Sequence, residues 1–313
     1  MSEIERLGLG LAALGRPAYI NLGRAGQLPA SRSVAAMRAA TWEVLDAAYA
    51  AGVRWVDAAR SYGRAEEFLA EWLADRGHTD VKVSSKWGYA YVGDWRTDAD
   101  VHEIKEHTLT RYRSQLAETR ALLGDRIGLY QVHSLTADSP LFADAALQRA
   151  LAATAAQGLP MGFSTTGAAQ ADTVRRALEL EVDGRRLFSA VQSTWNVLEP
   201  SVGDALGEAA AAGLRVMVKE ALANGRLAVH PPRQLAEVAE RHGVGPDAVA
   251  LAAALARLPW AGTVLLGGVS VAQLRANLDA AKVSLDESDL ARLDALATPP
   301  ADYWAARTAL PWT

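Results

Sequence analysis

The sequence predicts an α/β protein that closes into a (β/α)8 barrel. Short β-branched or apolar runs alternate with longer stretches of helical period that are rich in Ala, Leu, Glu and Arg. Strands that alternate with helices indicate a parallel sheet with helical crossovers. The strand–helix unit recurs eight times, and eight units in roughly 250–300 residues suit a closed barrel. No low-complexity linker divides the chain, so we expect a single domain over residues 1–313, with a doubly wound open sheet as the alternative fold.

The first half of the chain contains four of these units. Gly52, Gly77 and Gly124 each follow a stretch of helical period, as glycines that close helices do. The predicted strands are 7–14, 53–57, 81–86 and 127–133, and the predicted helices are 34–51, 64–76, 101–123 and 143–157. Within the third of these helices, His102 and His107 are five residues apart and point to different faces, so we interpret this stretch as a solvated face and not as a metal site.

The second half of the chain continues the alternation and adds a C-terminal extension. The predicted strands are 160–164, 187–193, 214–219 and 263–266, and the predicted helices are 168–180, 201–212, 233–242, 246–258 and 271–281. One extra helix follows at 285–297. The tail 298–313 opens on Pro299-Pro300, through which a helix cannot continue, and its aromatic side chains are expected to pack over the domain.

Composition and charge exclude several classes of protein. The chain has no cysteine, which removes disulfides, thiolate metal sites and a cysteine nucleophile. A formal net charge of −4 argues against nucleic-acid binding and against attraction to an acidic membrane. No run approaches the ~18 apolar residues that span a bilayer, and the N-terminus lacks the basic start of a signal peptide. We therefore expect a cytoplasmic protein that acts on small molecules, with no bound metal.

Four residues at or just after the carboxyl ends of the predicted strands have side chains suited to proton transfer. Asp57 ends the second strand, Tyr62 follows it by five residues, Lys86 ends the third strand and His133 ends the fourth. In a barrel, such ends converge on the site of chemistry. A lysine cation would lower the pKa of the tyrosine, a carboxylate would keep that lysine charged, and the histidine could hydrogen-bond a carbonyl oxygen. These four residues predict proton transfer at a carbonyl group.

The segments around these residues resemble the three signature segments of the aldo-keto reductase superfamily. They are Asp57-Ala58-Ala59-Arg60-Ser61-Tyr62-Gly63, Ser85-Lys86 and Leu129-Tyr130-Gln131-Val132-His133. The resemblance extends over about residues 7–281. It implies a (β/α)8 barrel that binds NADP or NAD without a Rossmann fold. It also implies hydride transfer between nicotinamide and a carbonyl or alcohol substrate (aldehyde, ketone or sugar-like), with Tyr62 as the proton donor.

The resemblance also implies a set of cofactor contacts. They are Ser164, Thr165, Gln192, Trp195, Leu222, Gly225, Gly267, Val269, Gln273 and Asn277. Thr165 stands where the family has asparagine, Trp195 stands for a stacking aromatic, and Glu220 replaces a serine near the diphosphate. A basic residue for the adenosine 2′-phosphate is replaced by Val269, but Arg275 could still reach that group. We expect NADP(H), with NAD(H) as the other candidate.

Loop aromatics are the candidate walls of a substrate pocket. They are Tyr19, Trp87, Tyr89, Trp95 and Trp304, and they suggest a partly apolar or ring-shaped carbonyl substrate. The alternative function is a nucleotide-sensing regulatory barrel with little turnover, as some members of this superfamily are. Turnover of any carbonyl substrate would separate the two. Metal-dependent hydrolysis lacks the clustered histidines and carboxylates it needs.

Overall fold

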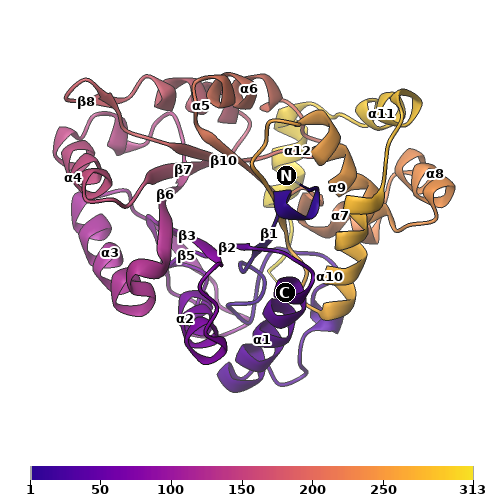
Figure 1. Cartoon of the computed structure of the whole chain (residues 1–313), viewed down its shortest axis with the longest axis horizontal. Helices are drawn as coiled ribbons and strands as arrows, with labels where there is room; N and C mark the ends of the chain where they lie inside the picture. The colour runs from indigo at the N-terminus through magenta and orange to yellow at the C-terminus, as the bar shows by residue number, and fades with distance from the viewer. Residues whose placement is uncertain (1, 313) are drawn as a thin grey trace.

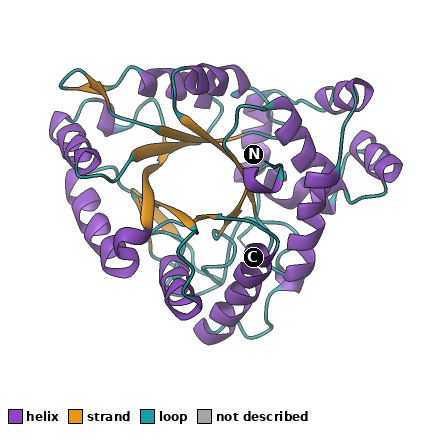
Figure 2. Cartoon of the chain, in the orientation of Figure 1, coloured by secondary structure: helices purple, strands orange, loops and turns teal. Residues whose placement is uncertain are grey.

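The computed structural model describes residues 2–312 and has a closed barrel of eight parallel strands at its centre (Figure 2). The order around the barrel is β1-β12-β11-β10-β7-β6-β3-β2, and β1 also pairs with β2, which closes the ring. The predicted fold class is therefore confirmed. The barrel strands are β1 (Leu7–Gly10), β2 (Trp55–Asp57), β3 (Lys82–Trp87), β6 (Ile127–Leu135), β7 (Met161–Thr165), β10 (Ala190–Thr194), β11 (Arg215–Lys219) and β12 (Thr263–Leu266).

Helices surround the barrel and cover the outer face of the sheet (Figure 1). They are α1 (Val34–Ala50), α2 (Ala65–Arg76), α3 (Leu109–Leu123), α4 (Ala145–Ala156), α5 (Gln170–Leu178), α6 (Gly203–Ala211), α7 (Arg226–Val229), α8 (Arg233–His242), α9 (Pro246–Arg257), α10 (Val271–Leu278), α11 (Glu287–Asp294) and α12 (Pro300–Thr308). Two short antiparallel pairs lie outside the barrel, namely β4 (Tyr89–Tyr91) with β5 (Glu103–Lys105) and β8 (Glu181–Val182) with β9 (Arg185–Arg186). No helix within residues 2–312 is both long and apolar enough to cross a bilayer.

The interior of the barrel is filled by side chains. Leu129, Ala190, Met217 and Leu265 form one buried cluster with Trp55 packed against it. These residues come from five different strands, so their contacts can only be made inside the ring. The inside of the barrel is thus a packed core, and the carboxyl ends of the strands remain available for polar groups.

The third helix begins later than the sequence predicts. Residues 103–105 form β5, which pairs with β4. The segment from β4 to β5, between β3 and α3, is called the β4–β5 excursion below. Helix α3 starts only after Thr108, whose side chain accepts a hydrogen bond from Arg111 N–H. His102 and His107 on this excursion are buried, so their interpretation as a solvated face is wrong. The charged residues next to these histidines suggested a solvated face. In the structure the excursion folds back onto the barrel, so both histidines are buried while Ile104 and Lys105 remain exposed.

The C-terminal tail contains a helix that the sequence analysis did not predict. α12 begins at Pro300, where a missing N–H costs nothing because the first turn of a helix has no partner for it. Tyr303 and Trp304 on this helix are buried, and Trp312 stacks on His102 with ring centroids 4.3 Å apart. The expected packing of the tail aromatics over the domain is confirmed.

Gly15, in the loop after β1, tests how tightly that loop packs on the segment that carries Tyr62. A Cβ atom on Gly15 would lie 2.3 Å from the Tyr62 carbonyl oxygen and 2.4 Å from the Cβ of Ala65. We expect Gly15→Ala to lower the free energy of unfolding by about 1–3 kcal/mol, as overpacking does. The matched control is Gly26→Ala, since nothing lies within 4 Å of a Cβ there. Equal urea midpoints for the two variants would contradict this packing.

Candidate active site

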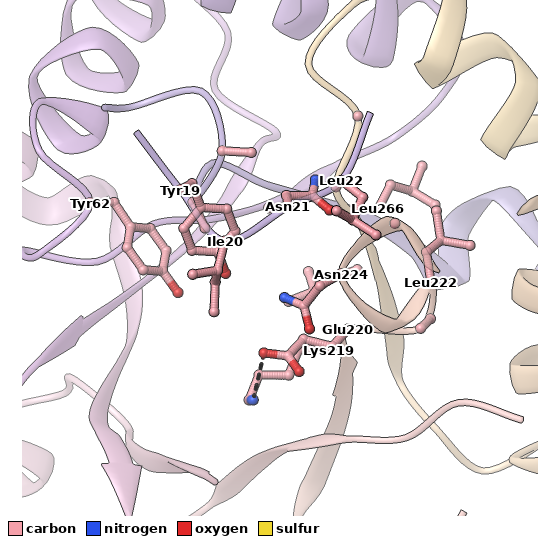
Figure 3. A pocket seen from close by; sticks show the side chains of 18 of the residues that line it. Tyr19, Ile20, Asn21, Leu22, Tyr62, Lys219, Glu220, Leu222, Asn224 and Leu266 are labelled. Atoms are coloured by element: carbon pink, nitrogen blue, oxygen red, sulfur yellow. Dashed lines mark ion pairs between the residues drawn. The ribbon is translucent and has the colours of Figure 1, made fainter. Parts of the chain in front are cut away.

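A cavity of about 400 Å³ opens at the carboxyl ends of the barrel strands. Its walls come from the loop after β1, from the β4–β5 excursion, from the loops after β11 and β12, and from the C-terminal tail. Figure 3 shows Tyr62 and Tyr19 on one side of this cavity, with Lys219, Glu220 and Asn224 facing them across it. The cavity therefore joins segments from both ends of the chain.

A buried ion pair forms the floor of the cavity on the Tyr62 side. The Lys86 ammonium contacts the Asp57 carboxylate and donates to the Ala58 carbonyl at 3.0 Å. It also lies 3.3 Å from the Tyr62 hydroxyl oxygen. The Asp57 carboxylate accepts further hydrogen bonds from three side chains on other barrel strands, namely Ser84 of β3 at 2.6 Å, Gln192 of β10 at 3.2 Å and Gln131 of β6 at 3.3 Å.

The electrostatics keep Tyr62 protonated. Burial raises the pKa of the Tyr62 hydroxyl well above 10, and the negative charge of Asp57 raises it further, while Arg16 opposes both. Lys86 was expected to lower this pKa, but the net shift is upward. The reason is that Asp57 balances the charge of Lys86, so burial of the Tyr62 hydroxyl determines the direction of the pKa shift. Tyr62 is therefore a neutral phenol at physiological pH.

His133 faces the same cavity from an irregular point in β6. The pairing of β6 with β7 shifts register between Val132 and Leu135, and Ser134 in this bulge has φ 55°. The Ser134 N–H donates to the Ser164 hydroxyl at 2.8 Å, which holds the bulge in place. Bulges beside functional sites redirect a side chain, and this one directs His133.

Two neighbours fix the orientation and charge of His133. The His107 Nε2–H donates to the His133 carbonyl oxygen at 2.8 Å, and the Ser61 hydroxyl lies 3.4 Å from His133 Nδ1. Burial lowers the pKa of His133 well below 6.5, and the charges of Lys86 and Lys219 add to this effect. His133 is thus a neutral imidazole beside Tyr62, with ring centroids 5.5 Å apart.

The opposite wall of the cavity carries a second set of charges. The Arg307 guanidinium of α12 donates to the Glu220 carboxylate at 2.9 Å, and the Lys219 ammonium lies 3.6 Å from the same carboxylate. Burial raises the pKa of Glu220, but the charges of Arg307 and Lys219 outweigh it and hold the pKa at about 2. Burial lowers the pKa of Lys219 to about 8. This wall thus places two basic side chains, Lys219 and Arg307, around one carboxylate.

The structure brings part of the expected cofactor set to the cavity. The four residues of the proposed tetrad meet there, with Lys86 reaching it through Tyr62 and Asp57. The expected cofactor contacts that line the cavity are Gln192, Leu222, Gly225, Gly267, Gln273 and Asn277. Of these, Gln192 already donates to Asp57, and the Gln273 side chain accepts from the Val269 N–H at 2.9 Å.

Four other expected cofactor contacts do not line the cavity. Ser164 supports the β6 bulge, and the Thr165 hydroxyl lies 2.6 Å from the Ser193 hydroxyl. Trp195 is buried in the main core and borders a separate surface groove, so it offers no stacking face here. Val269, in the loop after β12, is buried.

The expected substrate walls also divide into two groups. Tyr19 and Tyr89 line the cavity. Trp87 is fully buried against Tyr112, with ring centroids 5.0 Å apart. Trp95 donates to the Arg32 carbonyl at 2.7 Å, and Trp304 belongs to a buried cluster near α8 and α9. These three tryptophans do not form the walls of the cavity.

Sequence reasoning missed the polar side chains that the loops and the tail supply. They are Arg16, Glu103, Asn224 and Arg307. Arg16 could have been noticed because it follows the first strand as closely as Tyr62 follows the second. Glu103 and Arg307 lie far from any predicted strand end, so no sequence signal pointed to them. Within residues 2–312, His, Asp and Glu side chains form no group of three or more that could hold a metal ion.

Comparisons with known proteins agree with this geometry. The model of the aldo/keto reductase family matches residues 6–298, which is most of the chain, and the chain therefore belongs to that family. A search of curated proteins found no match.

Solved structures share the fold at low sequence identity. An aldo-keto reductase AKR11C1 from Bacillus halodurans, in its holo form, is 18% identical, with a TM-score of 0.68 over 94% of this chain and 92% of that chain. A glycerol dehydrogenase AKR11B4 from Gluconobacter oxydans is also 18% identical, with a TM-score of 0.68 over 93% and 90%. A Pseudomonas aeruginosa protein described as a putative aldo-keto reductase is 22% identical, with a TM-score of 0.64 over 88% and 90%.

The pair Arg307–Glu220 offers a test of how the tail is held. We expect Arg307→Met to lower the free energy of unfolding by about 3–5 kcal/mol, because it leaves a buried carboxylate without its main partner. Adding Glu220→Gln to that variant should recover part of the loss, because the unpaired carboxylate is removed while Lys219 still loses its counter-charge. Urea denaturation of the single and double variants measures both. A double variant no more stable than Arg307→Met would contradict the pairing.

Proposed function

We propose that this protein is an NAD(P)-dependent oxidoreductase that transfers a hydride between nicotinamide and a carbonyl or alcohol substrate. The observation that carries the proposal is the contact of the Tyr62 hydroxyl with Lys86, 3.3 Å away, at a cavity that His133 also lines. A neutral phenol, a charged lysine and a neutral imidazole at one cavity match the needs of a carbonyl group that gains a proton.

Tyr62 supplies the proton in this proposal. Its pKa lies well above 10, so the phenol carries its proton throughout the neutral range. As the substrate oxygen gains negative charge, the phenol proton moves to it, and the Lys86 ammonium stabilises the phenolate left behind. Asp57 keeps that ammonium in place, so no charge has to be brought into the dry site during the reaction.

His133 orients the substrate oxygen. Where the Ser61 hydroxyl donates to Nδ1 of His133, the ring proton sits on Nε2 and is free to donate to the carbonyl oxygen. The neutral imidazole therefore polarises the carbonyl without competing with Tyr62 as the acid. His107, whose own pKa is lowered by burial to about 4, stays neutral and holds the His133 backbone.

The residues on the other side of the cavity fit a nicotinamide nucleotide. The Asn224 side-chain oxygen lines the cavity, is buried and has no hydrogen-bond partner among the described residues, so it is ready to accept from a ligand hydroxyl or amide. Gly267 has open space where a Cβ would lie, and the wall of Lys219, Glu220 and Arg307 carries a net positive charge that suits a diphosphate. When bound, the nucleotide supplies or accepts the hydride.

The neighbours give the same class of reaction further support. The solved structures of similar fold include a protein named as a glycerol dehydrogenase and others named as aldo-keto reductases. We extend only the reaction class to this chain, since those structures are about one-fifth identical to it.

Tyr62→Phe tests the proton donor. We expect turnover to fall by at least ~10²-fold, because positioned acid catalysis is worth about 10²–10⁴-fold, whereas cofactor affinity should hardly change because the ring remains. Reduction of a panel of aldehydes with NADPH and NADH measures the first, and quenching of tryptophan fluorescence measures the second. A variant that keeps most of its catalytic rate would remove Tyr62 from this role.

Arg275→Ala tests the expected preference for NADP. Arg275 is exposed on α10, whose first turn adjoins Gly267 and Gly268 at the cavity, so its side chain is free to reach a phosphate there. A charge-assisted contact is worth roughly 1.5–3 kcal/mol, so we expect NADP affinity to fall by about tenfold or more and NAD affinity to stay the same. Arg113→Ala, an exposed arginine on α3, is the control. Equal loss for both cofactors would contradict a phosphate contact.

A further inference from the structure

The substrate end of the cavity contains a charged pair that the proposed chemistry does not use. Arg16 and Glu103 line the cavity together, with Arg16 Nη1 2.8 Å from Glu103 Oε1. We propose that this pair is a hydroxyl-recognition subsite, which selects carbonyl substrates that carry a hydroxyl group close to the reacting carbon. The inference rests on the proposed function, because it names the substrate class of the same site.

Arg16 is buried and held rigidly. Its side chain is 1% exposed, and it donates to the Ala12 carbonyl at 3.1 Å through Nε and to the Ser61 carbonyl at 3.2 Å through Nη1. The guanidinium carbon lies 4.5 Å from the ring centre of Tyr19 and 5.0 Å from that of Trp312. These contacts fix the plane of the guanidinium before any ligand arrives, which lowers the entropic cost of binding one.

The pair retains unused hydrogen-bonding capacity on both sides. The Nη2 group of Arg16 has no acceptor within residues 2–312, although the rest of the guanidinium is engaged. Glu103 Oε1 is buried and lacks a hydrogen bond in the described chain, because the close ion pair with Arg16 is not aligned as one. Buried polar groups are normally hydrogen-bonded, so a buried carboxylate oxygen held only by an ion pair, beside a guanidinium nitrogen without an acceptor, suits a ligand hydroxyl.

A hydroxyl group is the partner that fits both. Its oxygen can accept from Arg16 while its proton is donated to Glu103. A carboxylate or phosphate fits less well, since Glu103 already neutralises Arg16 and would repel a second anion. A purely apolar substrate would keep water from the Nη2 donor of Arg16 without giving it an acceptor, which is costly. The pair therefore favours a neutral, hydroxylated substrate.

The position of the pair sets where the hydroxyl must lie. The Arg16 guanidinium carbon is 5.1 Å from the centre of the Tyr62 ring, so the pair adjoins the group that would protonate the carbonyl oxygen. Tyr19 borders the same region in Figure 3. A substrate bound at Tyr62 would reach Arg16 through a substituent on the carbon next to the carbonyl or the one after it. The substrate class is a short hydroxyaldehyde or hydroxyketone, or the corresponding polyol.

If Arg16 and Glu103 had only a structural role, their loss would affect the kinetics in a different way. Arg16 and Glu103 also tie the β4–β5 excursion to the loop after β1, so their loss could simply loosen the site. Loosening would lower the rate for every substrate alike. Recognition of a hydroxyl would change the ratio between substrates that differ only in that group, and this ratio is the quantity to measure.

The test compares kcat/KM for glyceraldehyde and propanal in the full-length protein with its preferred cofactor. We expect the parent protein to prefer glyceraldehyde by about tenfold or more, as one charge-assisted hydrogen bond would give. Glu103→Gln keeps the shape but leaves Arg16 without its counter-charge. This variant should lose most of the glyceraldehyde preference and gain activity on glyoxylate, whose carboxylate would then match Arg16. The control is Glu106→Gln, on the same excursion, whose carboxylate pairs with Arg111 instead and should leave the ratio unchanged.

The outcomes separate this inference from the proposed function. A parent protein that reduces both aldehydes equally, or a Glu103→Gln variant with an unaltered ratio and no gain on glyoxylate, overturns the subsite and leaves the oxidoreductase assignment standing. If the parent reduces neither aldehyde and no other member of the aldehyde panel with NADPH or NADH, the proposed function fails. The subsite is then decided by saturation-transfer NMR with 1,2-propanediol and 1-propanol. Stronger transfer to the diol that is lost in Glu103→Gln supports the subsite, and equal transfer to both alcohols overturns it.

Discussion

The arrangement of the site depends on one buried ion pair, between Lys86 and Asp57. A charge inside a barrel is tolerated only when it is paired and hydrogen-bonded, because burial removes its hydration. The barrel meets this requirement with side chains from strands on several sides, since Ser84, Gln131 and Gln192 all donate to the Asp57 carboxylate. The polar side chains at the carboxyl end of an otherwise apolar barrel are therefore arranged around this pair. Tyr62 and His133 lie beside this pair: the Lys86 ammonium is 3.3 Å from the Tyr62 hydroxyl, and its charge adds to the effect of burial in lowering the pKa of His133.

Segments far apart in the sequence complete the cavity above this layer. The loop after β1 contributes Arg16 and Tyr19, the β4–β5 excursion contributes Glu103, and α12 contributes Arg307. The ion pairs Arg16–Glu103 and Arg307–Glu220 connect these segments to one another and to the end of β11. In the proposed function, the loops and the tail would select substrate and cofactor and the barrel would supply the proton-transfer groups, a division that barrel enzymes share.

Much of this could be predicted from the sequence, for physical reasons that also explain the failures. The eight strands were predicted because a parallel strand buried on both faces is a short apolar run, and the convergence of Asp57, Tyr62, Lys86 and His133 followed from their places at strand ends. The excursion at residues 89–105 was missed because its charged residues have no clear period, and α12 was missed because Pro300 begins a helix as well as ending one. The direction of the Tyr62 pKa was wrong because burial, which the sequence does not reveal, outweighs a lysine whose charge is already matched.

In the proposed reaction, the Lys86–Asp57 pair leaves Tyr62 as a neutral phenol that donates the proton. The most direct measurement is the pH dependence of kcat for reduction of an aldehyde, with cofactor and substrate both saturating so that binding steps do not contribute. Because the pKa of Tyr62 lies well above 10, the account predicts a level kcat across the neutral range and a decline only at pH values above about 10. A decline of kcat with a midpoint near neutral pH, lost in Tyr62→Phe, would contradict it.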